Sequence, residues 1–241
     1  MADRSEVSDE QLLLSVLTTE HSTLQAARSG AIAEGSGRVQ IFLTTLSTLL
    51  VAIAFVGQAT DFGTPFYTFA LTVLPAMLVV GYATFMRVLQ TLLCDAYYAL
   101  AISRIRQHYT TLHPDAESLM MIPTVTGVHA IRVEAALEKK LHPLQALFMI
   151  SGMVAFVEAL VAGALVALVI NRVFEGAGVW AVAIGVLTAV AIVAALFLYG
   201  RTYVWGALAQ LGVSPPWKKG SSTPASDWKN GQEQRSNGSP S

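Results

Sequence analysis

The chain has 241 residues, of which only 13% are charged and 54% are apolar, and its formal net charge is −1. Because a soluble domain carries about twice that share of charged residues, lipid has to cover much of this surface. The near-neutral charge argues against a nucleic-acid partner, which needs a concentrated basic face. The single cysteine, Cys94, excludes an intramolecular disulfide and a multi-thiolate metal site.

Residues 1–38 predict an amphipathic helix outside the bilayer. Its apolar residues fall on one face at helical spacing: Leu13, Leu17, Leu24 and Ala31. Three glycines, Gly30, Gly35 and Gly37, lower the helix propensity of the last turns. We therefore expect a bend or a break in this helix just before the membrane.

A first transmembrane hairpin is predicted over residues 39–86. Val39–Ala59 and Phe66–Met86 are uncharged and long enough to cross, since roughly 20 residues suffice. The connection Thr60–Pro65 is so short that the second span has to return antiparallel. The polar residues of the first span cluster on a face that we expect to meet protein: Gln40, Thr44, Ser47 and Thr48.

Residues 87–143 predict a cytoplasmic helical segment. The apolar stripe of the second span continues past Arg87 without a stop signal until Pro114. At 1.5 Å per residue this helix projects on the order of 30 Å past the membrane. A loop over 113–127 and a short helix over 128–141 follow.

A second transmembrane hairpin is predicted over residues 144–200, with spans Leu144–Asn171 and Ala177–Gly200. Small residues recur at every fourth position of both spans: Ser151, Ala155, Ala159 and Gly163 in the first, and Ala181, Gly185 and Ala189 in the second. Such stripes indicate close packing of the two backbones. Residues 201–241 predict the end of a cytoplasmic helix followed by a disordered tail rich in Pro, Ser and Gly.

The distribution of basic residues predicts the topology. All of the 15 Lys and Arg residues except Arg172 lie in segments 1–38, 87–143 and 201–241. Basic residues hold short loops on the inner side, so these three segments and both termini are expected in the cytoplasm. The expected fold class is an all-α plasma-membrane protein with four transmembrane helices, arranged as two antiparallel hairpins with long cytoplasmic helical extensions.

One acid stands out within the apolar spans. Glu158 is the only charged residue between Lys140 and Arg172, and it lies near the middle of its span, close to the expected hydrocarbon midplane. An ionisable group at such a position is a functional-site hypothesis. The alternative is a protonated, structural carboxyl that hydrogen-bonds to a neighbouring helix. Candidate polar partners at similar depth are Ser47, Thr48 and Thr72.

No other constellation predicts chemistry. His108, His113, Asp115 and Glu117 straddle a helix end and a loop and lack a regular ligand spacing, so we predict no metal site and no cofactor. A phosphate-cradling glycine loop, a nucleophile elbow and a helical His-Glu-x-x-His motif are missing from the sequence. We therefore predict that the protein is not an enzyme.

Several short runs in roughly the first half of the chain carry a resemblance: residues 20–29, 37–38, 42–43, 54–58, 87–90 and 104–106. Together they resemble a family of actinobacterial four-span integral membrane proteins without an assigned activity. It implies a bacterial plasma membrane and supplies no catalytic motif. A helix before a two-span hairpin is also similar to the SLATT membrane effectors of bacterial conflict systems, which have two spans instead of four.

Two main functional hypotheses follow from the sequence, and a membrane-damaging defence effector is a third class. The first is a non-enzymatic oligomerisation or interaction platform in the lipid bilayer, with homo-oligomers and a cytoplasmic protein as partners. The alternative is a small oligomeric ion channel or proton-coupled transporter that uses Glu158, in which several copies bring their acids together around an axis.

Overall fold

The computed structural model of the chain describes residues 2–112, 115, 120, 130–131, 150–174 and 177–210. Its long elements are all helices: α1 (Ala2–Ala59), α2 (Thr64–Leu112), α6 (Ile150–Val173) and α7 (Gly178–Gln210). Each is long and apolar enough to cross a bilayer, which fits a multi-pass membrane protein. The loop predicted over 113–127, the short helix over 128–141 and the tail from Ser214 lie outside the described helices or rest on isolated residues.

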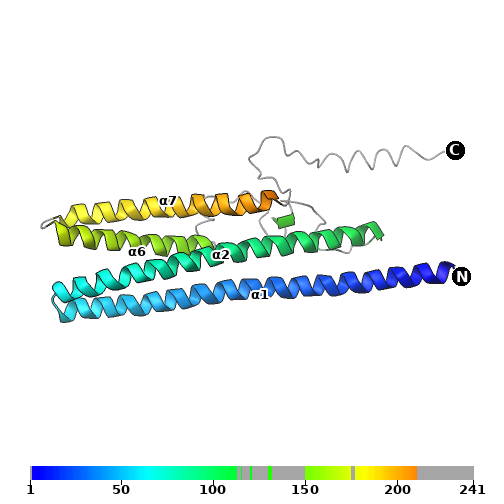
Figure 1. Ribbon diagram of the computed structural model, residues 1–241, viewed down its shortest axis with the longest axis horizontal. Coiled ribbons are helices and arrows are strands. Elements are labelled where there is room, and N and C mark those ends of the chain that lie inside the picture. Colours follow the sequence, from blue (N-terminus) through cyan, green and yellow to red (C-terminus); the bar gives the residue numbers. More distant parts are fainter. Residues whose placement is uncertain are drawn as a thin grey trace.

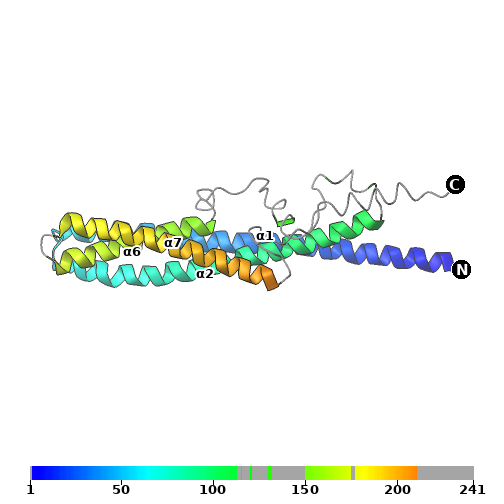
Figure 2. The same ribbon diagram turned by 90° about the horizontal axis from the view of Figure 1, so that it is seen from above.

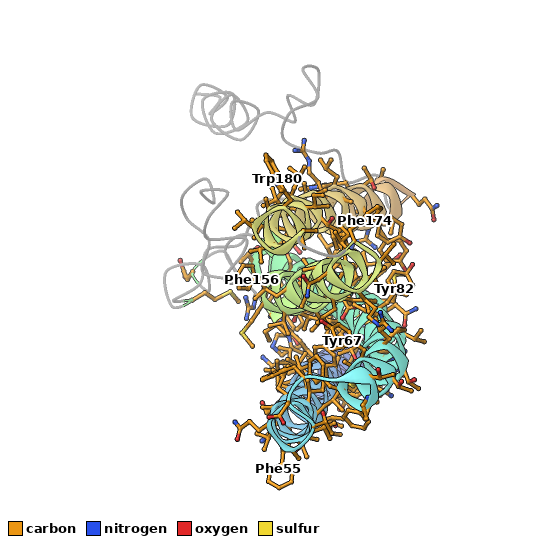
Figure 3. All side chains as sticks on the ribbon, turned by 90° about the vertical axis from the view of Figure 1, so that its left-hand side faces the viewer. Phe55, Tyr67, Tyr82, Phe156, Phe174 and Trp180 are labelled. Carbon is orange, nitrogen blue, oxygen red and sulfur yellow. The ribbon has the colours of Figure 1, made fainter. Side chains whose placement is uncertain are left out.

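The four helices form a row. Figure 1 shows them stacked in the order α1, α2, α6 and α7, and the end-on view in Figure 3 shows the same order. Each helix packs against its neighbour, whereas α1 and α7 make no contact over their described lengths. The two outer helices are consequently the most exposed, and Phe55 on α1 and Trp180 on α7 both point away from the row (Figure 3).

Helix α1 packs on α2 along one continuous seam. From His21 onward, most residues of α1 that are buried or half-buried recur every three or four positions: His21, Leu24, Arg28, Ala31, Gly35, Val39, Phe42, Leu46, Leu49, Ile53 and Val56. This spacing is the pattern of a coiled-coil seam. It runs from the segment outside the predicted span into the span itself without a change of face.

The predicted break before the membrane is wrong, because α1 is helical from Ala2 to Ala59. The reason is the packing of Gly35 against α2. A Cβ atom at Gly35 would lie 3.0 Å from Cγ2 of Thr91. The low helix propensity of glycine, about 1 kcal/mol per residue, is here offset by the close approach of two helices that it permits.

A tight turn joins α1 to α2. The amide of Phe62 donates to the carbonyl of Gly57 at 2.9 Å, and the amide of Gly63 donates to that of Thr60 at 2.8 Å. Asp61 and Phe62 adopt left-handed φ angles of 47° and 53°, which are unusual for residues with a side chain. The Phe62 ring lies over Gly57, where a Cβ atom would meet it at 2.7 Å, so packing holds the turn in this conformation.

Small residues bring α6 and α7 into backbone contact. A Cβ atom on Gly163 would lie 2.5 Å from the carbonyl oxygen of Gly185, and one on Gly185 would lie 2.6 Å from that of Gly163. Ala189 belongs to the same contact, because its Cβ atom would lie 2.9 Å from a Cβ atom on Gly163. The other small residues of the two stripes are covered: Ala155, Ala159 and Ala181 are buried and Ser151 is half-buried. A longer side chain at Gly163 or Gly185 would separate the helices.

Candidate intramembrane site at Glu158

Glu158 lies where α1, α2 and α6 meet. It is on α6 and only 5% exposed, one of two polar side chains in the described core. Its carboxyl group rests on Gly81 of α2, where a Cβ atom would collide with Oε2 of Glu158 and would lie 3.0 Å from the Phe42 ring of α1. Gly81 is therefore the residue that makes room for the carboxyl group between the helices.

Within the described part of the chain the carboxyl group has no polar partner. Its Oε2 atom is buried and makes no hydrogen bond with any described residue. Three ion pairs, Arg28–Asp95, Arg38–Glu34 and Arg87–Glu34, lie elsewhere, between α1 and α2 or within α1. A buried polar atom without a partner costs free energy, and a carboxylate costs far more than a protonated carboxyl.

The candidate partners named from the sequence are not brought to Glu158. Ser47, Thr48 and Thr72 lie on exposed faces of α1 and α2. Each hydroxyl donates to the carbonyl four residues earlier in its own helix, at 2.8, 3.0 and 2.7 Å respectively. These three residues were chosen for their predicted depth in the bilayer, but their side chains lie on faces of α1 and α2 that do not meet Glu158.

Along α2, Glu158 lies nearer to Arg87 than to Tyr67. Gly81 lies about 9 Å along α2 from Arg87 and about 21 Å from Tyr67, at 1.5 Å per residue. At the far end, Asn171 of α6 donates to the Tyr67 hydroxyl at 3.1 Å, and the Arg172 guanidinium lies 5.8 Å from the Tyr67 ring centroid. Glu158 is thus closer to the Arg87 end of the bundle, because its depth follows from its register against α2.

A charged cluster lies at that end, between α1 and α2. The Arg87 guanidinium donates to Oε1 of Glu34 at 2.8 Å, and Arg38 pairs with the same oxygen at 3.2 Å. The two arginines hold the pKa of Glu34, which lies before the predicted span, below its usual value of 4.5, with the hydrogen bond from Arg87 as the largest cause. The cluster has one carboxylate for two guanidinium groups, so it carries a net positive charge.

A second ion pair braces the same two helices further out. Nε of Arg28 donates to Oδ1 of Asp95 at 2.6 Å, and both side chains are mostly covered, at 17% and 24% exposure. Arg28 is a seam position of α1, so this pair fixes how α1 and α2 are aligned along their lengths. The sequence did not indicate this ion pair, because Arg28 and Asp95 lie on different predicted helices.

The site can hold a proton but has few ligands for anything larger. In the described residues no three His, Cys, Asp or Glu side chains come close enough to bind a metal ion together. Comparison of the chain with protein-family models, with curated proteins and with solved structures finds no match. The function therefore has to be argued from the geometry of the chain itself.

Proposed function

We propose that this chain is a non-enzymatic, multi-pass plasma-membrane protein whose helices α1 and α2 continue beyond the bilayer as an association platform. Its two helix pairs, α1–α2 and α6–α7, are the two antiparallel hairpins in this proposal. Both chain termini and the projecting part of α1 and α2 lie in the cytoplasm, as the distribution of basic residues predicts. We call this projecting part, residues 2–38 and 87–112, the arm.

The observation that carries the proposal is an exposed apolar surface at the end of the arm. Leu12, Leu13 and Val16 are 65%, 43% and 57% exposed. The His21 ring lies tilted beside the Tyr109 ring near the end of α2, with ring centroids 6.5 Å apart, so residues before about position 18 lie past the end of α2. Figure 1 shows this free length of α1 at the N-terminal end of the molecule. Exposed apolar residues grouped in water mark an interaction site.

The arm is built to hold that surface in place. The partly buried Arg28–Asp95 pair and the contact of Gly35 with Thr91 join α1 to α2 outside the predicted spans. The same seam continues into the bilayer through Val39 and Phe42. The surface lies on the part of α1 that continues from this braced helix pair as a helix, and a surface on a helix loses less conformational entropy on binding than one on a loose segment.

A second copy of the chain is the occupant that the observations favour. Leu12 and Val16 face away from the α1–α2 seam, and Thr44 and Thr48 share that face further along the helix. This one face is therefore apolar in the water-exposed region and hydroxyl-bearing in the lipid-exposed region. Both features suit protein contact, since hydroxyl residues support helix association in lipid. Figure 1 shows α1 along one edge of the row of helices, and Figure 2 shows its N-terminal part extending past the end of α2.

Counting subunits in lipid nanodiscs tests the proposal. We expect the wild-type chain to associate and the double variant Leu12→Ser/Val16→Ser to associate at least about tenfold more weakly, because each fully buried Leu or Val contributes about 1.5–3 kcal/mol. The matched control is Gln25→Ser, an exposed polar position of the same arm, which should associate like the wild type. Equal association of the double variant and the wild type would disprove the proposed surface.

One observation favours the alternative of a channel or proton-coupled transporter: the buried, unpartnered oxygen of Glu158. The hydroxyls that could continue a path from it point to the outer faces of α1 and α2, which favours the platform. Proton and cation flux in liposomes distinguishes the two. The platform predicts the same background flux for the wild type and Glu158→Gln, whereas the channel predicts a flux that Glu158→Gln abolishes.

A further inference from the structure

The proposed platform does not explain why the carboxyl group of Glu158 is buried against Gly81. The carboxyl group takes the place that a side chain at position 81 would fill, and the ring of Phe42 closes the third side. A glycine on α2, a phenylalanine on α1 and an acid on α6 therefore meet at one point. This is the junction between the α1–α2 pair and the α6–α7 pair.

Among the described residues, no charged group pairs with the carboxyl group. On α1 the residues between Arg38 and Asp61 are uncharged, and on α7 so are those between Gly178 and Gly200. The described charged groups that follow these runs are Arg87 on α2 and Arg201 on α7 toward one end, and Arg172 on α6 at the other. The titratable neighbour Tyr82 on α2 is 50% exposed and points away from the junction.

We propose that Glu158 is a proton-binding site and that its bound proton holds α6 against α2 at Gly81. The ligand is a proton because the carboxyl group is closely covered by Gly81 and Phe42 and because no described cluster could coordinate a metal ion with it. In the protonated form the group is neutral and tolerates an apolar junction. In the ionised form it is a buried charge without a partner, which is strongly unfavourable.

Loss of the proton then moves the carboxylate group toward one end of the helix bundle. The carboxylate gains free energy by moving toward water and toward the positive cluster formed by Glu34, Arg38 and Arg87, about 9 Å along α2 from Gly81. To reach that end it has to leave its place on Gly81, so α6 separates from α2. The contacts within α1–α2 and within α6–α7 do not involve Glu158, and each pair moves as a unit.

The first measurement detects the proton directly, by infrared spectroscopy of the full chain in lipid nanodiscs. We expect the carbonyl band of a protonated carboxyl group at neutral pH in the wild type and its loss in Glu158→Gln, because exposed acids are ionised there. A spectrum at neutral pH without a band that depends on Glu158 overturns the proposal.

The second measurement follows the junction, by the distance between spin labels at Tyr82→Cys and Phe156→Cys with Cys94→Ser. These exposed residues lie on opposite sides of the row in Figure 3. As pH rises and the band disappears, we expect the distance to shift in the labelled wild type and to stay constant in Glu158→Gln. A constant distance through loss of the band, or the same shift in Glu158→Gln, overturns the proposal.

Gly81→Ala provides a test that does not depend on pH. The methyl group introduced at position 81 would occupy the place of the carboxyl group. At neutral pH we therefore expect the distance between the two spin labels that corresponds to separated α2 and α6. Adding Glu158→Ala removes the collision and should restore the short distance, now independent of pH. Ala83→Val, which adds bulk to an exposed position of α2, is the matched control and should leave the distance unchanged. If α2 and α6 stay separated in the Gly81→Ala/Glu158→Ala variant, the carboxyl group of Glu158 does not determine the contact between these helices.

Discussion

The pair α1–α2 and the pair α6–α7 are both held together inside lipid, yet by opposite means. Between α1 and α2 large side chains interlock, with Phe42, Leu46 and Leu74 almost fully covered. Between α6 and α7 the backbones themselves touch, at Gly163 and Gly185. Because lipid is as apolar as the side chains, neither pair gains from hydrophobic burial, and each depends on how well its surfaces fit.

This difference means that the two pairs should fail in different ways. The α6–α7 contact leaves no space at its centre, so it is sensitive to any added atom. The α1–α2 seam is filled by side chains, so it is sensitive to atoms that are removed. Its continuation outside the predicted spans contains ion pairs, which add a dependence on charge and pH.

The largest effect is expected from Gly163→Leu. A Cβ atom there already meets the Gly185 carbonyl at 2.5 Å, so the whole side chain forces the helices apart and the free energy of unfolding in lipid falls by about 3 kcal/mol. Steric-trapping measurements of unfolding provide the value. Ala164→Leu, on the exposed face of α6, is the control and should cost less than about 0.5 kcal/mol. Equal costs for the two variants would show that the close contact does not stabilise the pair.

Phe42→Ala should have the next largest effect, from the loss of atoms. Phe42 is 2% exposed, and we expect the free energy of unfolding to fall by about 2 kcal/mol. This is less than in a water-soluble core, because lipid replaces water around the side chain when the helices separate. The same unfolding assay applies to Leu50→Ala, 50% exposed on the same helix, which should be close to neutral. A large cost at Leu50 would mean that another molecule covers it.

The Arg28–Asp95 pair should contribute about 1 kcal/mol to the arm. Its partial burial raises the value above that of an exposed pair and still leaves some solvent screening. A double-mutant cycle with Arg28→Ala and Asp95→Ala, read by thermal unfolding in nanodiscs, measures the coupling. Arg38→Ala with Glu34→Ala, an exposed pair, should give a smaller coupling. Zero coupling between Arg28 and Asp95 would mean that packing alone aligns the arm.

The smallest effect is a pH dependence from Glu34. Its pKa is lower in the folded arm than the ordinary 4.5, so its contribution is complete above the ordinary value and is lost as pH falls through the folded value. We expect the melting temperature of the wild-type arm to fall between roughly pH 5 and pH 3 more than that of Glu34→Gln. Parallel pH profiles for the two proteins would show that the Arg87 hydrogen bond does not affect stability.

The spans themselves and the expectation of tight packing came from local patterns. Uncharged runs of sufficient length predict a helix across a bilayer, because the backbone has to satisfy its own hydrogen bonds there. Gly163 and Gly185 each belong to a stripe of small residues with four-residue spacing. This spacing places the small residues on one face of the helix, which predicts a close approach of another helix. These features depend only on residues that are near one another along the chain.

The surroundings of Glu158 could not be obtained in that way. Hydropathy placed the acid at mid-span and suggested Ser47, Thr48 and Thr72 as partners, but the register of α6 against α2 puts it on Gly81. In the same way, three glycines predicted a break in α1, yet contact with Thr91 keeps the helix continuous at Gly35.

Composition and periodicity alone determined that this chain forms long apolar helices, how many of them suit a bilayer, and which residues are small enough for close contact. Only the tertiary structure decided which helix faces which, that Glu158 has a glycine and a phenyl ring for neighbours, and that Arg28 meets Asp95. The physical reason is that propensity and hydropathy act within a few residues, whereas rotation and register are chosen by contacts between segments far apart in the chain.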